Sequence, residues 1–546
     1  MNVSDAIIDS LTENGVDTVF GIPGKQTLPL NEVISERDDI RFVMARHETN
    51  VSHQAWGFAE TSGRMAATVV IPGPGDMNAM NGLKNALNDN TALLHIAVET
   101  EPEIRGGDGI HETPTDTYDN VVKENMTVET PQSTVADIER AIEIARTAPK
   151  GPVRVGIAKN FIPMDVELAD TESIESPSET APPEGKVKAA GDLLANAAAP
   201  VIVAGGGVRS ANASPELRAV AETLEAPVVT TYKGKSTFPE DHPLFAGVLC
   251  GGTSTELRAH LEEADVVLGV GTDFDAVWTN AWSYDLPEAL VHVTMNASDV
   301  GTGYDASVGI VADARRTLAT LDAELSERTP AGGTGERRAA AVREADADRL
   351  NELRTVSEPP LTTVSAVTAL REALPRDTVV AADAGGSRLW TLVSFPTYDP
   401  RDYVNPGSWA TMGVSVPAAI GAKVANPEQP VAAFVGEGGL MMCLEELHTL
   451  AAESLDVTVF VFNNNDYAII SEEAQRSFSL DDGAYGWQDK PLDLIAIAEG
   501  MGLRTARAET PQEVAAAAEA AIGNGPTLVE IPTDPYEPQA SEFMTR

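Results

Sequence analysis

Three polar side chains that follow two apolar segments could together hold a metal ion beside a phosphate group. Glu437 stands in Gly436-Glu437-Gly438-Gly439 directly after the apolar run 431–435, and Asn464 and Asp466 follow a second apolar run, 457–462. Glycines let the backbone approach a diphosphate at the start of a helix, where free N–H groups favour anions. A carboxylate, an amide oxygen, a loop carbonyl and phosphate oxygens make the oxygen-rich shell that Mg²⁺ prefers.

A parallel strand–helix–strand unit is expected to position these residues. The two apolar runs have the length and the polar or glycine boundaries of buried strands, and apolar residues between them, from Leu440 to Ala451, recur at helical spacing. Parallel strands end at the same edge of a sheet, so Glu437 and Asn464 can meet although they lie 464 − 437 = 27 positions apart. An ordinary unit of this kind with a glycine-rich turn is the alternative interpretation.

The stretch resembles the thiamine-diphosphate motif, in which Gly-Asp-Gly is followed further along the chain by Asn-Asn. In that family the second Asn and the backbone oxygen two residues later bind the metal, which corresponds here to Asn464 and the carbonyl of Asp466. The metal-binding Asp of the family is Glu437 in this chain. Its extra methylene moves the carboxylate by about 1.5 Å, whereas Mg²⁺ requires ligands at about 2.0–2.1 Å. The resemblance thus predicts thiamine diphosphate and Mg²⁺, with an adjusted backbone or weakened metal binding at Glu437.

A second acid that could do chemistry is Glu48, in residues 46–64, RHETNVSHQAWGFAETSGR. It stands at a strand-to-helix junction, where a carboxylate taken alone favours a helix cap. The segment resembles the R-H-E-x-x-A-x-x-x-A-x-G-x-A stretch of the acetolactate synthase and pyruvate oxidase group, and Gly57 and Ala59 match positions in it. The resemblance makes Glu48 the catalytic acid that pairs with the cofactor's aminopyrimidine and favours the tautomer able to take a proton from the thiazolium carbon.

Further segments resemble the cofactor-binding parts of the same family. Met412, in TMGVSVPAAIGAKV, takes the place of the apolar residue that holds the cofactor bent, so that its amino group reaches the thiazolium carbon. Tyr467-Ala468-Ile469 stands where the family packs the thiazolium ring, with Ala468 in place of a frequent Gly. The full set of cofactor-binding candidates is Glu48, Gly73, Asn78, Gly385, Gly386, Ser387, Met412, Gly436, Gly438, Gly439, Asn464, Tyr467, Ala468 and Ile469. For Gly385 to Ser387, a plain turn at a strand end is the alternative.

Helix and strand patterns alternate along the chain and predict an α/β protein with three consecutive doubly wound, mainly parallel-sheet domains. Two polar segments separate them: 169–186, rich in Pro, Ser and Glu, and 326–359, which includes a charged helical stretch. The expected domains are an N-terminal pyrimidine-binding domain (1–168), a central Rossmann-like domain (187–325) and a C-terminal diphosphate- and metal-binding domain (360–546). The expected strands are 18–20, 40–43, 66–71, 93–98, 153–157, 201–204, 227–229, 266–270, 290–293, 431–435, 457–462 and one ending at 382.

Composition limits the classes of partner. The 546 residues carry 38 Lys and Arg against 83 Asp and Glu, a net charge of −45, which repels nucleic acid and anionic membranes, so neither is expected as a partner. Acid spread along the chain suggests a protein that works in high salt. Cys250 and Cys443, both in apolar surroundings, predict buried free thiols and, with no signal segment at the N-terminus, a cytoplasmic protein.

The resemblance covers essentially the whole chain and implies a homodimer or tetramer in which Glu48 of one subunit meets the metal motif of another. The turn Gly205-Gly206-Gly207 lacks the G-x-G-x-x-G spacing and favours a structural role over a dinucleotide site. The segment 271–277, GTDFDAV, lacks both arginines of the G-A-R-F-D-D-R segment of acetolactate synthase, so FAD is left open but doubtful. Lys25, His53 and His111 could supply charge or protons to substrate, with surface solvation as the alternative.

The expected function is decarboxylation of a small 2-oxo acid with carboligation, as in acetolactate synthase, by an enzyme that depends on thiamine diphosphate and Mg²⁺. A simple 2-oxo acid decarboxylase and a flavin-linked pyruvate oxidase remain open, as does a cofactor-binding homologue without catalysis. Retention of Glu48 argues against the last, because a non-catalytic descendant has no need of a buried acid. A small regulatory subunit also remains open as a partner.

Overall fold

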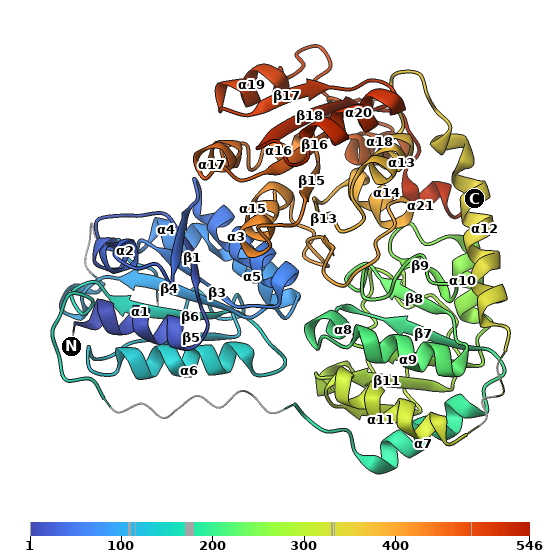
Figure 1. Ribbon diagram of the computed structural model, residues 1–546, viewed down its shortest axis with the longest axis horizontal. Coiled ribbons are helices and arrows are strands. Elements are labelled where there is room, and N and C mark those ends of the chain that lie inside the picture. Colours follow the sequence, from blue (N-terminus) through green and yellow to red (C-terminus); the bar gives the residue numbers. More distant parts are fainter. Residues whose placement is uncertain are drawn as a thin grey trace.

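The computed structural model describes residues 2–106, 111–114, 116–169, 179–328, 331, 333–481 and 483–546, which form three α/β domains (Figure 1). Each domain contains one six-stranded sheet, and every strand pair that the structure describes is parallel. The interior strands are buried on both faces, which explains why they appear in the sequence as continuous apolar runs. The expected fold of three consecutive parallel-sheet domains is confirmed.

The N-terminal domain has the strand order β2-β1-β3-β4-β6-β5, with helices on both faces of the sheet (Figure 1). Its strands are β1 (Thr18–Gly21), β2 (Arg41–Met44), β3 (Ala66–Val70), β4 (Leu93–Glu99), β5 (Glu124–Thr127) and β6 (Val153–Ala158). Its helices are α1 (Val3–Glu13), α2 (Leu28–Ser35), α3 (Glu48–Ser62), α4 (Pro74–Asn78), α5 (Met80–Asn88), the 3₁₀ turn η1 (Pro102–Ile104) and α6 (Thr134–Arg146). Because β2 and β3 flank β1, the helices that follow their carboxyl ends, α3 and α4, begin at the same edge of the sheet.

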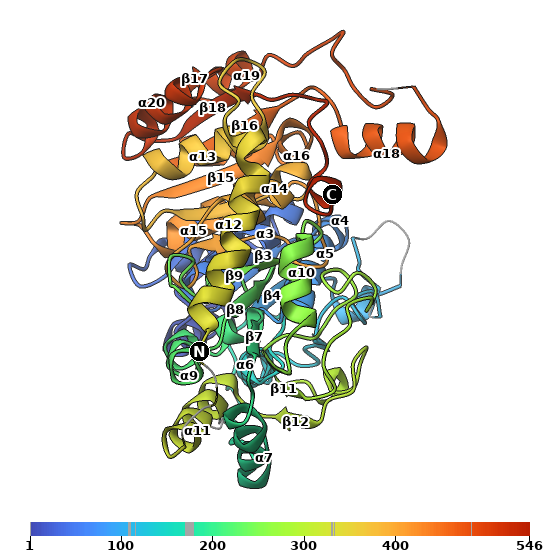
Figure 2. The same ribbon diagram turned by 90° about the vertical axis from the view of Figure 1, so that its right-hand side faces the viewer.

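The central domain has the order β12-β11-β10-β7-β8-β9, so its first strand lies in the middle of the sheet. Its strands are β7 (Pro200–Ala204), β8 (Val228–Thr231), β9 (Phe245–Leu249), β10 (Val266–Val270), β11 (Leu290–Thr294) and β12 (Val308–Val311). Its helices are α7 (Glu184–Ala195), α8 (Gly206–Ser210), α9 (Ser214–Leu224), α10 (Thr255–Glu262), η2 (Ala297–Asp299) and α11 (Ala314–Ser326). The charged helix α12 (Gly335–Arg354) then leads along one side of the molecule to the last domain (Figures 1 and 2).

The C-terminal domain repeats the strand order of the first, as β14-β13-β15-β16-β18-β17. Its strands are β13 (Val379–Ala382), β14 (Tyr403–Val404), β15 (Val431–Gly436), β16 (Val457–Asn463), β17 (Arg504–Arg507) and β18 (Thr527–Pro532). Its helices are α13 (Thr363–Ala373), α14 (Gly386–Ser394), α15 (Ser415–Ala425), α16 (Glu437–Leu440), α17 (Glu446–Ala452), α18 (Ala468–Phe478), α19 (Leu494–Gly500), α20 (Pro511–Ala521) and α21 (Ala540–Phe543). None of the helices described in the structure is long and apolar enough to cross a membrane.

Helices α3 and α15 join the N-terminal domain to the C-terminal domain. A Cβ atom added to Gly57 would lie 2.3 Å from the carbonyl oxygen of Ala418, and one added to Gly421 would lie 1.9 Å from the carbonyl oxygen of Gln54. Gln54 also donates to the buried carboxylate of Glu446, 2.9 Å away at the start of α17. The glycines of both sequence segments therefore permit a close backbone contact between two domains.

The single helix expected after Gly439 is divided in two. Helix α16 ends at Leu440 and α17 begins at Glu446, and between them the chain makes tighter turns in which Cys443 N donates to Leu440 O and Glu446 N to Cys443 O, both at 3.0 Å. Leu440, Cys443 and Leu447 are nevertheless buried in the same core. The apolar spacing therefore continues across the break, which explains why the sequence predicts one helix.

Candidate active site

A cavity of about 180 Å³ lies in the C-terminal domain, beside the carboxyl ends of β13, β15 and β16. The described residues that line it all belong to the segment 363–539. They include every candidate predicted in this part of the chain: Gly385, Gly386, Ser387, Met412, Gly436, Glu437, Gly438, Gly439, Asn464, Asp466, Tyr467, Ala468 and Ile469. Residues separated by more than eighty positions in the sequence thus meet because parallel strands place them at one sheet edge (469 − 385 = 84).

Glu437 is the acidic centre of this cavity. Its side chain is buried, and its Oε1 accepts a hydrogen bond from Asp466 N at 2.9 Å and its Oε2 one from Asn464 N at 3.4 Å. Burial raises the pKa of Glu437 to about 7. No cationic side chain among the described residues bonds to it, so a bound cation would stabilise its ionised form.

These residues fit a magnesium ion held together with a diphosphate. The described residues contain no cluster of three or more His, Cys, Asp and Glu side chains, so a metal here would depend on other oxygens. Glu437 would supply a carboxylate, Asn464 an amide oxygen and Asp466 a backbone carbonyl, and phosphate oxygens and water would complete the shell. This is the donor set that the sequence predicts.

The glycines around Glu437 are needed for space. A Cβ atom on Gly438 would lie 2.5 Å from the ring of Tyr467, and one on Gly439 would lie 3.0 Å from Asp383 Oδ1. The Tyr467 ring is itself held edge-to-face against Trp487, with centroids 5.1 Å apart. A side chain at Gly438 would therefore displace Tyr467, which lines the cavity, and one at Gly439 would crowd the buried carboxylate of Asp383.

Asp383 organises the cavity, and sequence reasoning did not single it out. It is fully buried, and its carboxylate accepts hydrogen bonds from the amides of Ala384 (2.8 Å), Gly413 (2.9 Å) and Ser415 (3.0 Å). Burial raises the pKa of Asp383. These bonds tie the end of β13 to the start of α15 and so fix Met412 against the cavity. The available sequence signal was an acid directly after an apolar strand.

Glu537 is a second acid of the cavity wall that sequence reasoning missed. Its Oε2 accepts a hydrogen bond from Thr363 N at 2.6 Å, at the start of α13, and burial raises its pKa to about 7. The residue follows β18 in an irregular segment, where no periodic pattern marks it. Only the packing of that segment over α13 brings Glu537 to the site.

The candidates Glu48, Gly73 and Asn78 lie together in the N-terminal domain and do not line the C-terminal cavity. Glu48 is the first residue of α3, and its Oε2 accepts a hydrogen bond from Asn78 Nδ2 at 3.0 Å. A Cβ atom on Gly75 would lie 3.0 Å from Glu48 Oε1, so the glycine lets the loop approach the carboxylate. Gly73 has a φ of +67°, a conformation that favours glycine.

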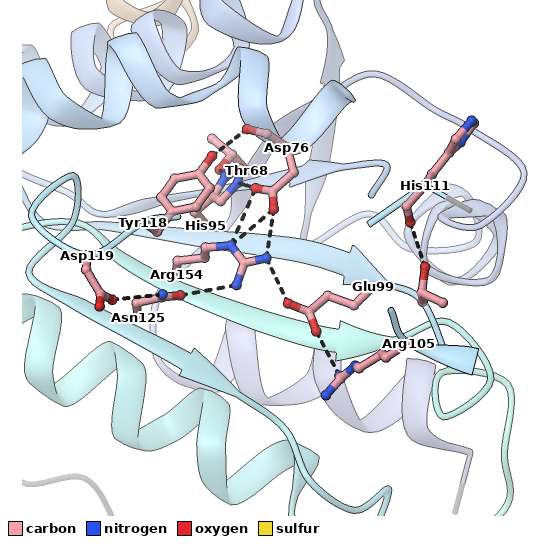
Figure 3. Close-up of polar contacts among 11 residues, drawn as sticks. Thr68, Asp76, His95, Glu99, Arg105, His111, Tyr118, Asp119, Asn125 and Arg154 are labelled. Carbon is pink, nitrogen blue, oxygen red and sulfur yellow. Dashed lines mark hydrogen bonds and ion pairs between the residues drawn. The ribbon is translucent and has the colours of Figure 1, made fainter. Parts of the chain in front are cut away.

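A buried ion network fixes the loop that supports Glu48 (Figure 3). Asp76, fully buried between Gly75 and Asn78, lies 2.9 Å from His95 Nε2 and accepts from Arg154 Nη2 at 2.7 Å. Arg154 Nη2 also donates to Glu99 at 2.8 Å. Burial alone would raise the pKa of Asp76, but the His95 hydrogen bond and the Arg154 charge outweigh it and hold that pKa well below its usual range.

The two groups of candidates do not meet within one chain. None of the described residues lining the C-terminal cavity comes from the N-terminal domain, and Glu48 lies instead beside Asn78 and Gly75. In each of the two groups a buried carboxylate holds the surrounding loop: Asp76 in the N-terminal domain and Asp383 in the C-terminal domain.

Comparison with known proteins gives the family. Residues 1–121 match the "Thiamine pyrophosphate enzyme, N-terminal TPP binding domain", residues 187–321 the central domain and residues 383–531 the C-terminal TPP binding domain. The chain belongs to the thiamine pyrophosphate enzyme family. The family membership that the sequence motifs predict is thereby confirmed.

Several relatives of this thiamine pyrophosphate family protein span nearly its whole length. The probable acetolactate synthase large subunit of Methanocaldococcus jannaschii is 30% identical over 98% of this chain and 93% of its own length. The acetolactate synthase isozyme 1 large subunit of Escherichia coli is 28% identical over 98% and 94%. A solved structure of a putative thiamin diphosphate-dependent enzyme from Mycobacterium smegmatis has a TM-score of 0.80 at 24% identity, covers 98% of this chain and 99% of that one, and shows the shared fold.

The three candidate substrate residues of this family member occupy different environments. Lys25 is exposed in the turn after β1, and His111 is exposed with its ring directed away from the ion network (Figure 3). His53 is buried in α3, where burial lowers its pKa to about 3, so it is a neutral group inside the domain. The geometry of a single chain therefore gives His53 no route to a substrate, whereas Lys25 and His111 remain accessible.

The glycine-rich turn of the central domain is the place to examine for flavin binding. The turn Gly205-Gly206-Gly207 lies where the strand order reverses, which is where dinucleotides bind in such sheets. The amides of Gly205 and Gly207 already donate, at 2.9 Å each, to backbone carbonyls at the end of β10. Asp273 and Asp299 line the adjoining cavity of about 330 Å³. Two amides of this turn are therefore already occupied, although Lys150 and Lys233 also line the cavity.

Proposed function

We propose that the protein is a thiamine-diphosphate- and Mg²⁺-dependent enzyme that decarboxylates a small 2-oxo acid, with carboligation as in acetolactate synthase. The observation that supports this most strongly is the glycine-lined cavity in which Glu437, Asn464 and Asp466 converge. Relatives named as acetolactate synthase large subunits, at 28–30% identity over nearly the whole chain, favour that reaction class.

The chain's own residues would bind and orient the cofactor and move one proton. Glu437, Asn464 and the Asp466 carbonyl would hold the metal and diphosphate, and Met412, fixed through Asp383, would support the bent cofactor. Glu48, with Oε2 held by Asn78, leaves Oε1 to hold a proton at the aminopyrimidine nitrogen. Thiamine diphosphate, when bound, supplies the nucleophilic carbon that adds to a 2-oxo acid and retains the electrons as carbon dioxide leaves.

We propose further that the active site forms between subunits of a cytoplasmic homodimer or tetramer. Glu48 belongs to one wall and Glu437 to another, and no N-terminal residue described in the structure reaches the C-terminal cavity of its own chain. Because these relatives are named large subunits, we include a small regulatory subunit among the proposed partners. An isolated monomer would then be inactive.

A simple decarboxylase of the same family is the second candidate. The segment 271–277 carries Asp273 and Val277 where the resemblance expects arginines, which favours release of free aldehyde over the use of a second 2-oxo acid. The bonded amides of Gly205 and Gly207 in the central domain count against a flavin-linked oxidase. A cofactor-binding protein without catalysis is opposed by the Glu48–Asn78 hydrogen bond, which presents a carboxylate at the site.

The test begins with apoprotein titrated with thiamine diphosphate and Mg²⁺, followed by carbon dioxide release from a panel of 2-oxo acids. Saturable cofactor binding and carbon dioxide release are the expected results. Acetolactate or acetoin among the products identifies carboligation, and free aldehyde alone identifies the simple decarboxylase. Cofactor binding without carbon dioxide release from any 2-oxo acid would overturn the proposal.

A further inference from the structure

A second cavity, of about 510 Å³, lies where the three domains meet and has an unusual lining for so acidic a protein. Six of its lining residues are basic: Arg64, Arg146, Lys150, Arg209, Arg315 and Arg401. The chain as a whole has 83 acidic residues against 38 basic ones. With more than two carboxylates for every cation, each of these six could have been paired.

Three of the six cations are paired and three are not. Arg64 pairs with Asp17, Arg209 with Glu60 and Arg315 with Glu179. Arg146, Lys150 and Arg401 form no ion pair with any carboxylate of the described residues. These last three carry the argument.

The three unpaired cations contact backbone carbonyls or an amide. Arg146 Nη2 donates to Asn14 O at 2.6 Å, and Lys150 Nζ donates to Ser210 O at 2.9 Å. Arg401 donates to two backbone carbonyls and to one side-chain amide oxygen, at 2.7–3.0 Å. A guanidinium has five N–H donors and an ammonium three, so Arg146 and Lys150 each retain donors that no described protein group uses.

Burial and the charges of Arg401 and Arg146 disfavour the charged form of Lys150. All three side chains are partly buried, and burial lowers the pKa of each. For Lys150, the Arg401 and Arg146 charges lower the pKa further, which places the three cations within electrostatic range of one another. Gathering like charges in a partly buried cavity costs free energy unless an anion joins them.

The charge balance of the cavity indicates the class of that anion. Asp89 on the wall lies 3.6 Å from Lys233 and is paired with it. Glu60 is paired with Arg209, although its charge also acts on Lys150 and Arg401, which leaves Asp313 as the unpaired carboxylate among the described residues that acts on Lys150. Three positive charges and one negative charge leave about two to be neutralised. A phosphate group carries about −1.5 to −2 at neutral pH, and arginine forks with a lysine are suited to its oxygens. A 2-oxo acid, with a single carboxylate, would neutralise only half of this charge.

We propose that this cavity binds a small phosphate-bearing anion between the unpaired cations Arg146, Lys150 and Arg401. Its volume lies within the range of about 300–1,000 Å³ that is usual for small-molecule sites. Because Arg146 and Lys150 belong to the N-terminal domain, Arg401 to the C-terminal domain, and α8 of the central domain lines the same cavity, the anion would bridge all three. The inference does not depend on the proposed reaction.

Isothermal titration of the full-length protein, saturated with thiamine diphosphate and Mg²⁺ and held at constant ionic strength with KCl, tests this site. Saturation with the cofactor keeps the probes out of the diphosphate cavity. The probes are inorganic phosphate, ADP and adenosine. We expect one equivalent of phosphate or ADP to bind per chain and adenosine not to bind. Binding of both phosphate and ADP would identify the phosphate group itself as the ligand, and binding of ADP alone would identify a nucleotide.

Lys150→Met is the decisive variant and should weaken binding by about tenfold or more, as expected for loss of a charge-assisted contact. Lys123→Met is the matched control, because Lys123 is also a partly buried lysine bonded to backbone carbonyls but does not line the cavity. Arg146→Gln serves as a second variant if Lys150→Met does not fold. Failure of both phosphate and ADP to bind, equal binding by the two lysine variants, or adenosine binding as tight as ADP binding would each overturn the proposal.

Discussion

The N-terminal and C-terminal domains have the same strand order but present very different carboxylates at the equivalent edge of the sheet. Glu48, in the first, is partly exposed, and a neutral amide holds one of its oxygens. Glu437, in the last, is buried, accepts two backbone N–H groups, and has its pKa raised to about 7 by burial. One topology therefore supports a partly exposed acid bonded to an amide side chain and a buried acid bonded to two backbone amides.

The supporting structures differ in the same way. Beneath Glu48, the loop is fixed by a charged network around Asp76 and Arg154. Around Glu437, the loop is fixed by glycine contacts and by Asp383, which accepts hydrogen bonds from three backbone amides. A charged network fixes the loop beside partly exposed Glu48, whereas buried Glu437 accepts hydrogen bonds from two neutral backbone amides. The following predictions test this contrast, beginning with the largest effect.

Removing Glu48, the acid that we propose exchanges a proton, should have the largest effect on the reaction. Glu48→Gln keeps the Asn78 contact possible but cannot exchange a proton, so carbon dioxide release should fall by about 10²-fold or more. Circular dichroism and the unfolding midpoint should remain unchanged. Unaltered carbon dioxide release in this variant would remove Glu48 from the mechanism.

Breaking the network under Glu48 should cost stability as well as activity. Asp76→Asn leaves buried Arg154 with a single carboxylate partner, so the free energy of unfolding in urea should fall by about 3 kcal/mol. The matched control is Asp9→Asn, because its Arg37 partner is partly exposed, and it should cost less than about 1 kcal/mol. Equal losses in the two variants would mean that burial of the network contributes nothing.

The contact that joins the two domains should tolerate no added methyl group. Gly421→Ala places a Cβ atom against the Gln54 carbonyl oxygen, so the free energy of unfolding should fall by about 1–3 kcal/mol. Gly500→Ala is the control, since nothing lies within 4 Å of its added Cβ atom, and it should be neutral or slightly stabilising. A thermal melt of each variant measures the difference, and a stable Gly421→Ala protein would show that α3 and α15 can separate without cost.

The buried acid should make magnesium binding depend on pH. A raised pKa means that ionising Glu437 costs folded apoprotein stability: that stability is greatest below the unfolded value near 4.5 and declines as pH rises through about 7. Mg²⁺ binds the ionised form, so its affinity in the presence of thiamine diphosphate should be about tenfold weaker at pH 6 than above pH 7.

Titration calorimetry at several pH values measures this dependence. Glu437→Asp should keep the dependence and bind Mg²⁺ at least as tightly, whereas Glu437→Gln should lose both affinity and slope. A flat pH profile in the unchanged protein would separate Glu437 from the metal. Marked loss of affinity in Glu437→Asp would show that the site is built for the longer acid.

Most interior strands could be predicted from the sequence, whereas of the six edge strands only β2 was predicted, at 40–43. Strands such as β3, β7 and β15 appear as apolar runs because both of their faces are covered. The unpredicted strands β5, β9, β12, β14 and β17 all lie at sheet edges, where polar residues such as those of β5 and β17 weaken the pattern. The interior strand β18 was not predicted, because buried Glu530 interrupts its apolar run. The carboxylate of Glu530 accepts a hydrogen bond from Asn463 Nδ2 at 2.7 Å.

The sequence by itself determined which residues cluster at the end of each domain's sheet, because parallel strands bring their following loops to one edge. It predicted Glu437 beside Asn464, and Glu48 at the start of its helix, from local spacing alone. Only the tertiary structure decided how those acids are supported. Asp383, Glu537 and the partners of Asp76 come from segments distant in the chain, and burial, which sets the charge preference of each carboxylate, is a property of packing that no local pattern carries.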